Sequence, residues 1–331
     1  MLNKRIFILV IMLTFFVTLI ITDRLIKFFE RKKISQKILE IGPCWHKSKE
    51  GTPTMGGVGF VIASFISFLT VCVCFGKELE KRDLLCLINV FMFGLLNCLI
   101  GVIDDLAKVR NKRNEGLTPK AKLIFQGVAA ILFLIAMKHL VGMKTALFIP
   151  FLKAEIELGF AYYILTFLLL CGTVNAVNIT DGLDGLASIC VLPIGALFIF
   201  FGINLEEGVA PTFFGAMLIG ITVSFLIFNL HPARIFMGDT GSLFLGAIVV
   251  GVSFAIDNPA LVLIYGMVFI FEAVSDILQV GYFKVTKGKR LFKMAPFHHH
   301  LERCGLSEMK IVYLFGAVST LFCVLACFGM R

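Results

Sequence analysis

Long apolar runs separated by short polar segments dominate the chain. Ten runs are long enough, or nearly so, to cross a bilayer as a helix, which takes about 20 apolar residues. They cover residues 6–22, 55–75, 84–103, 123–141, 158–177, 186–203, 213–229, 241–255, 261–282 and 310–330. The eighth is short and rich in glycine, so we expect it to tilt or to pack at the centre. With no internal repeat or linker, the sequence predicts an all-α polytopic membrane helix bundle of about ten transmembrane helices, forming one integral membrane domain over residues 1–331.

Composition excludes the main soluble classes. Of the 331 residues, 58% are hydrophobic and 16% are charged, whereas soluble domains are about 25% charged. The 35 phenylalanines argue against a disordered chain. Most of the ten cysteines lie inside apolar runs, where they act as small hydrophobic residues. The net charge of +9 is better explained by membrane topology than by nucleic acid, and we expect no nucleic-acid partner.

Lysine and arginine fall unevenly on the two sides of the predicted bundle. With ten spans, both termini lie on one side, and the loops after spans 1, 3, 5, 7 and 9 lie on the other. Those loops, together with Lys310 at the start of the last span, carry 22 of the 31 basic residues. Because basic residues accumulate in cytoplasmic loops, this side is predicted to be cytoplasmic and both termini extracytoplasmic. No small-residue cleavage site follows Thr22, so the first span is predicted to remain as a membrane helix.

Unusual polar clusters gather on the side predicted to be cytoplasmic. They cover residues 49–57 (KEGTPTMGG), 104–105, 175–184 (NAVNITDGLD), 229–242 (NLHPARIFMGDTGS) and 295–300 (APFHHH). The loops predicted on the other side are short and plain. A structural protein has no reason to gather carboxylates, glycines and histidines from five distant segments on one face, whereas an enzyme acting at the membrane surface does.

Five aspartates are the candidate metal-binding and proton-transfer groups. Asp104 and Asp105 close the third span, where one could bind a metal and the other handle a proton, unless they form an ordinary solvated helix end. Asp181 and Asp184 lie three apart on one helical face, although one could be an N-cap. Asp239 opens the eighth span in GDTGS, a helix start that suits an anion. Phosphate there would need Mg²⁺ between it and the carboxylate, so Asp239 is the first choice of metal ligand, with an N-cap as the alternative.

Cationic and hydrogen-bonding side chains supply the candidate phosphate-binding groups. His298, His299 and His300 follow a basic stretch, and three consecutive histidines rarely bind one zinc ion. We interpret them as hydrogen-bond donors to phosphate. Lys49 and Thr54 precede a double glycine and suit a phosphate partner, although most lysines at such positions only anchor a helix at the cytoplasmic surface.

Three polar residues share one face inside the ninth span: Glu272, Asp276 and Gln279. Carboxylates within a span are costly unless they face protein, water or a cation. We therefore expect either a polar cavity lined by the cytoplasmic half of this helix or buried pairing with lysine or arginine from a neighbouring helix.

The combination of carboxylates, lysine, histidines and glycine-rich loops at a membrane surface points to Mg²⁺-dependent phosphoryl transfer. The sequence contains neither a G-x-S-x-G motif nor a dinucleotide fingerprint. A site at the membrane edge lets a soluble donor enter from the cytoplasm while a lipid phosphate arrives between the helices.

At these residues the sequence resembles a known family. The strings KEGTPTMGG, IDD, NAVNITDGLDGLA, ARIFMGDTGSL and QVGYFKVTKGKRLFKMAPFHHHLE are similar, in this order, to the bacterial phospho-N-acetylmuramoyl-pentapeptide transferases (the MraY family). The resemblance implies transfer of the phospho-sugar from UDP-N-acetylmuramoyl-pentapeptide to undecaprenyl phosphate, giving lipid I and UMP with Mg²⁺ as cofactor. It also implies a multi-pass protein of the bacterial cytoplasmic membrane, with the active site on the cytoplasmic face, and commonly a homodimer.

The resemblance also implies roles for individual residues. Asp239 matches the Mg²⁺-binding aspartate, and Asp104 and Asp105 match a pair of which one is proposed to deprotonate the lipid phosphate; His298 completes the expected catalytic set. The expected substrate-binding residues are Lys49, Thr54, Asn178, Asp181, Asp184, Asn229, Gln279, Ala295 and His299. We favour direct attack by the lipid phosphate, because its oxygen is already a nucleophile and no covalent enzyme intermediate is required.

Two other functions compete with this interpretation. A sister enzyme that transfers N-acetylglucosamine-1-phosphate to the same lipid shares the aspartate clusters and a histidine-rich loop, but the fuller GTPTMGG and APFHHH strings favour the muramoyl enzyme. A transporter with an ion site at mid-membrane would explain Glu272 and Asp276. Transporters usually show matching broken helices in two halves of the chain, and the sequence shows no such symmetry.

Overall fold

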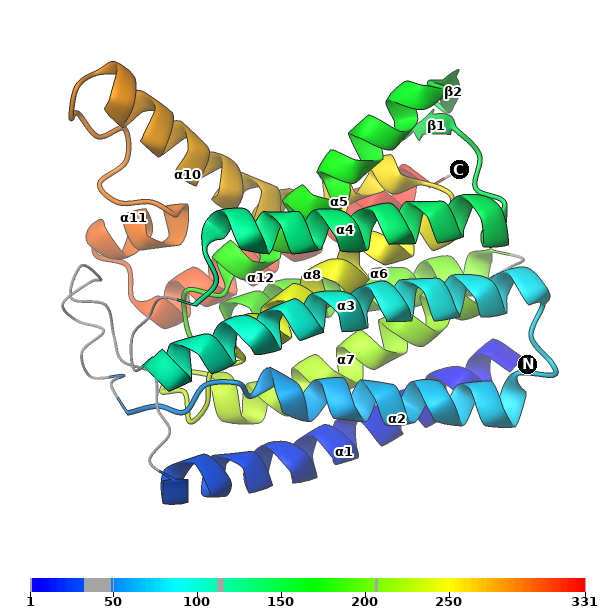
Figure 1. The fold of residues 1–331 in the computed structure, drawn as a ribbon, viewed down its shortest axis with the longest axis horizontal. Helices are drawn as coiled ribbons and strands as arrows, with labels where there is room; N and C mark the ends of the chain where they lie inside the picture. Colours follow the sequence, from blue (N-terminus) through cyan, green and yellow to red (C-terminus); the bar gives the residue numbers. More distant parts are fainter. Residues whose placement is uncertain (1, 33–48, 50, 112–115, 206–207, 331) are drawn as a thin grey trace.

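The fold is a bundle of long helices (Figure 1), seen in a computed structural model that describes residues 2–32, 49, 51–111, 116–205 and 208–330. Several basic residues of the loop after the first predicted span, in the range 33–48, lie outside the described residues. The long helices are α1 (Leu2–Lys32), α2 (Gly57–Phe75), α3 (Lys81–Asn111), α4 (Pro119–Ala136), α5 (Phe160–Thr180), α6 (Leu186–Asn204), α7 (Val209–Asn229), α8 (Gly238–Ala255), α10 (Met267–Val285) and α12 (Glu308–Phe328).

Short elements connect these helices. A π-helical turn, η2 (Met137–Val141), extends α4 and leads to an antiparallel hairpin of β1 (Ala146–Ile149) and β2 (Ala154–Glu157), in which Ala146 pairs with Glu157. This hairpin was not predicted from the sequence, because its two strands have only four residues each. The remaining elements are η3 (Pro259–Leu261), α9 (Val262–Tyr265) and α11 (Phe297–Arg303), which carries the three histidines.

The predicted multi-span bundle is confirmed. Among the described residues, nine helices are long and apolar enough to cross a membrane, and a bent pair makes up to ten. The bent pair occupies the ninth predicted span, where residues 259–265 and α10 meet at 79° instead of forming one straight helix. The break falls at Gly266, whose backbone ψ of 8° departs from the helical value. Two further helices, α1 and α3, extend well beyond the predicted apolar runs, so Asp104 and Asp105 lie within α3.

The centre of the bundle is α8, as its glycine content predicted. Within its apolar stretch 89% of residues are buried, against 28% for α1 at the periphery. Small residues on α8 let neighbouring backbones approach closely. A Cβ atom on Gly57 of α2 would lie 2.4 Å from the backbone of Gly241, and one on Gly246 would lie 2.9 Å from the backbone of Val174 in α5. This packing holds the start of α8 against α2, and its middle against α5.

The two termini lie at the same end of the bundle, marked N and C on the right of Figure 1. The α10–α11 loop and α11 lie at the opposite end, on the left of the same view. An even number of membrane crossings predicts that both termini lie on the same side of the membrane. Their position at one end of the bundle agrees with that prediction.

Candidate active site

Three carboxylates meet where the C-terminal part of α3 contacts the start of α8. One oxygen atom from each of Asp104, Asp105 and Asp239 can be chosen so that all lie within 4.8 Å of one another. Asp104 and Asp105 are buried, with 3% and 2% of their surface exposed, and Asp239 is partly exposed. Three negative charges at this spacing repel one another, so the cluster requires cations or strong hydrogen-bond donors.

The negative charge of Asp105 is stabilised by hydrogen-bond donors at the N-terminus of α8. Its Oδ2 accepts hydrogen bonds from the Thr240 backbone N–H at 2.9 Å and the Thr240 hydroxyl at 2.7 Å, and Oδ1 accepts from the Asp239 N–H at 3.2 Å. These N–H groups have no partner within the first turn of the helix, and the helix dipole favours a negative charge there. A carboxylate from another helix thus performs the capping role that the sequence offered as an alternative for Asp239.

Two lysines neutralise the other carboxylates. The Nζ atom of Lys108, one turn after Asp104 on α3, lies 2.7 Å from Asp104 Oδ2 and 3.0 Å from Asp239 Oδ2. Lys122, in the first turn of α4, lies 2.6 Å from the same Asp239 oxygen. Sequence analysis named neither lysine. The i,i+4 spacing of Asp104 and Lys108 was an available signal, but nothing in the sequence placed Lys122 near Asp239.

Asn178, a predicted site residue, reaches the cluster from the end of α5. Its Nδ2 donates to Asp239 Oδ1 at 2.9 Å and to the Ser242 hydroxyl at 2.7 Å. The next turn carries Asp181, and desolvation together with the charges of Asp239, Asp105 and Asp184 raises the pKa of the Asp181 carboxyl well above its usual range. The predicted Asp181 and Asn178 therefore belong to the same electrostatic environment as the three carboxylates.

The donor set of this cluster fits a hard divalent cation. Its ligand atoms are carboxylate oxygens, with the amide oxygen of Asn178 next to them, and Mg²⁺ prefers oxygen ligands and few protein carboxylates. Asp239 and Asp104 are the residues that could hold it, because Asp105 already accepts three hydrogen bonds from α8. The ammonium groups of Lys108 and Lys122 occupy the same space around Asp239 Oδ2, and could turn to phosphate oxygens when a cation binds.

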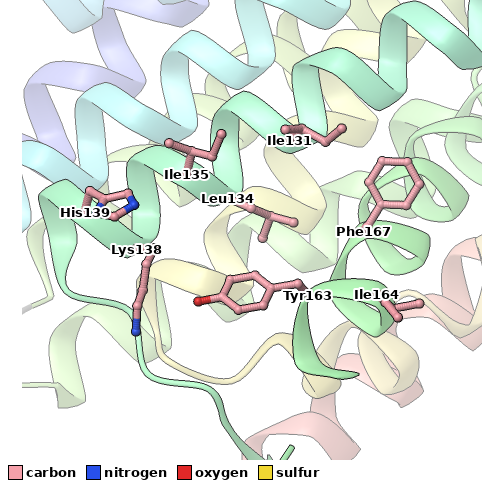
Figure 2. Close-up of a pocket in the computed structure, with 8 residues that line it drawn as sticks. All are labelled: Ile131, Leu134, Ile135, Lys138, His139, Tyr163, Ile164 and Phe167. Atoms are coloured by element: carbon pink, nitrogen blue, oxygen red, sulfur yellow. The ribbon is translucent and has the colours of Figure 1, made fainter. Parts of the chain in front are cut away.

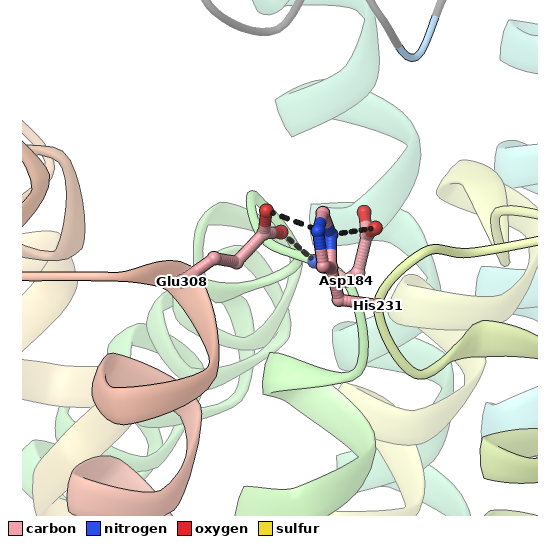
Figure 3. A group of neighbouring side chains, drawn as sticks. All are labelled: Asp184, His231 and Glu308. Atoms are coloured by element: carbon pink, nitrogen blue, oxygen red, sulfur yellow. Dashed lines mark hydrogen bonds and ion pairs between the residues drawn. The ribbon is translucent and has the colours of Figure 1, made fainter.

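A second polar cluster brings together residues from four distant segments (Figure 3). Lys49 Nζ lies 2.7 Å from Asp184 Oδ1 and 2.5 Å from Glu308 Oε1. His231 Nδ1 lies 3.0 Å from Asp184 Oδ2 and 3.2 Å from Glu308 Oε2. The predicted Lys49 and Asp184 are thus direct partners. His231 and Glu308 were missed, because isolated residues at helix starts and in loops carry no distinctive pattern.

Asn229, the last residue of α7, joins the turn between α5 and α6 to the loop that precedes α8. Asn229 Oδ1 accepts from the Gly185 N–H at 3.1 Å, and its Nδ2 donates to the Ile235 carbonyl at 2.9 Å. Thr54 is buried next to the other end of this loop, since a Cβ atom on Gly238 would lie 3.0 Å from its hydroxyl and 2.6 Å from Asp105 Oδ2. Asn229 therefore holds the loops of the site in place and Thr54 lies beside Gly238, while direct contact of either residue with substrate stays a prediction.

The histidine loop packs against α10. His298 Nδ1 lies 2.8 Å from Glu272 Oε2, so the buried partner of Glu272 is a histidine, and not the lysine or arginine that one of the two alternatives named. His299 Nδ1 pairs with Glu302 Oε2 at 2.7 Å. Gln279 binds backbone, accepting from the Leu291 and Phe292 N–H groups at 3.1 and 2.9 Å.

No predicted residue of this region, His298, His299, Gln279 and Ala295 included, has a described hydrogen bond to the three carboxylates. Ala295 precedes α11 and is partly buried, and Asp276 is also partly buried on α10. Substrate binding by Ala295 remains a prediction, and the role of Asp276 remains open.

A separate cavity of about 450 Å³ lies between α4, η2 and α5 (Figure 2). It is lined by Ile131, Leu134, Ile135, Lys138, His139, Tyr163, Ile164 and Phe167. Leu134 lies twelve residues after Lys122 on α4, which is roughly 18 Å along the helix. The apolar lining and this separation place the cavity away from the charged cluster. The carboxylates, and not this cavity, are therefore the candidate active site.

Comparisons with known proteins agree with this geometry. Residues 87–257, which include both aspartate-bearing helix ends, match glycosyl transferase family 4. Residues 49–61 match the phospho-N-acetylmuramoyl-pentapeptide-transferase signature 1. The phospho-N-acetylmuramoyl-pentapeptide-transferase of Halalkalibacterium halodurans is 42% identical over 98% of this chain and 97% of the relative. That of Bacillus subtilis is 41% identical, with 97% of each chain covered. The chain therefore belongs to the phospho-N-acetylmuramoyl-pentapeptide-transferase family.

Proposed function

We propose that this protein transfers phospho-N-acetylmuramoyl-pentapeptide from its UDP-linked donor to undecaprenyl phosphate, releasing UMP and giving lipid I for peptidoglycan biosynthesis. The observation that carries the proposal is the cluster of Asp104, Asp239, Asn178, Lys108 and Lys122 at one end of a membrane helix bundle. Identity above 40% over nearly the whole chain supports the same reaction.

Mg²⁺ is the proposed cofactor, with Asp239 as its principal ligand and Asp104 beside it. When bound, the ion supplies charge neutralisation to a diphosphate at these carboxylates. The spacing of the three carboxylates and their oxygen-only donor set support this choice.

The cluster suits direct attack by the lipid phosphate on the diphosphate of the donor, without a covalent enzyme intermediate. An oxygen of the lipid phosphate forms a bond to the β-phosphorus of the donor, and the bond between that phosphorus and the UMP oxygen breaks, so UMP leaves with the electron pair. Asp104 is the group proposed to take the proton of the lipid phosphate, since it lies beside Asp239 and Lys108. Lys108 and Lys122 bind phosphate oxygens, which reduces repulsion between the two anionic substrates.

The bundle is proposed to lie in the bacterial cytoplasmic membrane, with the carboxylate cluster on the cytoplasmic side and both termini outside. The distribution of 22 of 31 basic residues supports this orientation, as does the position of the termini at the end opposite α11. The protein is proposed to act as a single domain and as a homodimer, in line with the family resemblance.

Release of UMP from UDP-N-acetylmuramoyl-pentapeptide is the direct test. The purified protein with added undecaprenyl phosphate and Mg²⁺ should release UMP and form a lipid-linked product in equal amounts. UDP-N-acetylglucosamine serves as the matched donor control and should give neither. Transfer from the control donor would assign the sister activity, and solute movement without UMP release would assign a transporter.

A further inference from the structure

Glu272 is a fully buried carboxylate on α10, with 0% of its surface exposed. A carboxylate in such surroundings needs strong hydrogen-bond donors. Its described partners both come from one residue: His298 donates its backbone N–H to Oε1 at 3.1 Å, and His298 Nδ1 lies 2.8 Å from Oε2. The two segments are 26 residues apart in the chain, so this contact fixes the start of α11 on α10.

The contact also selects a state of the imidazole. An ionised carboxylate can only accept hydrogen bonds, so His298 Nδ1 must carry the proton. When the ring is neutral, Nε2 presents a lone pair and is an acceptor. This differs from the donor role that the sequence suggested for the histidine run.

Nε2 of His298 faces the candidate active site. The side chain is 1% exposed, and Nε2 is buried without a hydrogen-bond partner among the described residues. A Cβ atom on Gly182 would lie 2.4 Å from Nε2, so the ring edge points at the turn between α5 and α6. Gly182 directly follows Asp181, whose carboxyl pKa is raised by desolvation and by the charges of Asp239 and Asp105.

From this geometry we propose that Glu272 is a positioning residue that holds His298 with Nε2 available to accept a proton or hydrogen bond from a bound substrate. The substrate group is an O–H or N–H donor held at the 181–185 turn, on either the sugar nucleotide or a protonated lipid phosphate. When Nε2 accepts a proton the ring becomes an imidazolium, and Glu272 stabilises that charge through Nδ1–H. The inference rests on the proposed function, because it requires a substrate at this turn.

The glycine at position 182 is part of the same arrangement. Any larger residue would fill the space in front of Nε2. With glycine at this position, a small donor atom of a ligand can fit there without a shift of the ring. A buried acceptor without a protein partner is costly, which is a reason for such an atom to be supplied by substrate.

The test compares Glu272→Gln, His298→Asn and the double variant in the UMP-release assay. Glutamine keeps the size of Glu272, but removes the charge and lets an amide N–H face Nδ1, which favours the wrong tautomer. We expect Glu272→Gln to lower kcat by at least about 100-fold, with little change in KM for either substrate. In the His298→Asn background it should cause no further loss, because the two residues act as one unit.

Ser275→Ala is the control. Ser275 is also buried on α10, and its hydroxyl donates to the Glu272 backbone carbonyl instead of contacting His298, so kcat should stay at the wild-type value. An unchanged kcat in Glu272→Gln, or losses that multiply in the double variant, would overturn the proposal. The same losses accompanied by a collapse of thermal stability only in Glu272→Gln would assign Glu272 a merely structural role.

A spectroscopic measurement tests the arrangement without turnover. In wild-type protein labelled with ¹⁵N-histidine, the resonances missing from His298→Asn identify this ring. They should report a neutral imidazole protonated at Nδ1. A proton on Nε2 would contradict the inference even if the enzyme is active. If the wild-type protein releases no UMP while the Nδ1 tautomer is present, the proposed function fails and the Glu272–His298 arrangement stands.

Discussion

Asp105 of α3 caps the first turn of α8 through Thr240, accepting hydrogen bonds from its backbone N–H at 2.9 Å and from its hydroxyl at 2.7 Å. The neighbouring Asp104 has a different environment, because among the described residues its Oδ1 accepts the Leu117 N–H at 2.8 Å and its Oδ2 faces Lys108. Two adjacent aspartates therefore have separate roles: Asp105 positions the helix that carries Asp239, and Asp104 faces the cations.

Asp105→Asn should destabilise the protein. The amide keeps one acceptor oxygen but loses the charge that strengthens three hydrogen bonds to α8, at a cost of about 2 kcal/mol. Thermal unfolding in detergent should show a lower Tm. Asp104→Asn is the matched control, with the smaller effect on Tm and the larger effect on UMP release. An equal Tm for wild type and Asp105→Asn would show that the cap contributes nothing.

Asp239→Asn should abolish transfer while leaving the protein folded. Asp239 is partly exposed at the start of α8, and its carboxylate serves the charged cluster instead of core packing. Loss of a residue that supports a metal ligand already costs about 10- to 100-fold, so loss of the proposed ligand should lower kcat by more than about 100-fold. UMP release and Tm are measured on the same preparation. Full activity in this variant would remove Asp239 from the site.

Chelation of Mg²⁺ should stop turnover reversibly. Without a divalent cation, Asp239 and Asp104 retain only lysine ammonium groups as counter-charges, and these cannot neutralise the carboxylates and a diphosphate together. EDTA should abolish UMP release, and excess Mg²⁺ should restore it to the same preparation. Turnover that survives exhaustive chelation would contradict the metal-dependent mechanism.

Lys122→Met should reduce both kcat and the Mg²⁺ concentration needed for half-maximal rate. The Lys122 ammonium lies 2.6 Å from Asp239 Oδ2, so it competes with a cation there before it can bind phosphate. An ion pair of this kind contributes about 1 kcal/mol, which corresponds to a several-fold change in apparent Mg²⁺ affinity. Lys120→Met, on the exposed side of the same helix turn, should change neither quantity. A weakened Mg²⁺ dependence in Lys122→Met would contradict this competition.

The number and location of the membrane helices could be predicted from the apolar pattern, because about 20 apolar residues in lipid leave the backbone little choice but a helix. The break at Gly266 could not, since glycine is frequent in membrane helices and only packing decides whether one bends there. The short hairpin between η2 and α5 lacked the length and alternation that identify strands.

The candidate site was partly predictable because sidedness brought distant polar segments to one face before any contact was known. Asp104, Asp239 and Asn178 do meet there, as do Lys49 and Asp184. The sequence could not separate the lysines that touch carboxylates from those that only anchor helices, since both kinds are common at cytoplasmic helix ends. Lys122 therefore emerged only from its distance to Asp239.

The orientation of the bundle can be tested with one native and one engineered cysteine. Cys304 is exposed after α11, near the histidine loop, and Lys153 is exposed in the turn of the β1–β2 hairpin. In Figure 1, α11 and the β1–β2 hairpin lie at opposite ends of the bundle. A membrane-impermeant maleimide applied to intact spheroplasts should label Lys153→Cys and leave Cys304 unlabelled until the membrane is permeabilised. Cys44, the exposed Cys74 and the partly exposed Cys72, Cys171 and Cys327 are replaced by serine in both proteins, and Cys304 is replaced as well in the Lys153→Cys protein, so that each signal has one accessible source. Labelling of Cys304 from outside would put the carboxylate cluster on the wrong side for a nucleotide donor made in the cytoplasm, and would overturn the proposed reaction together with the orientation.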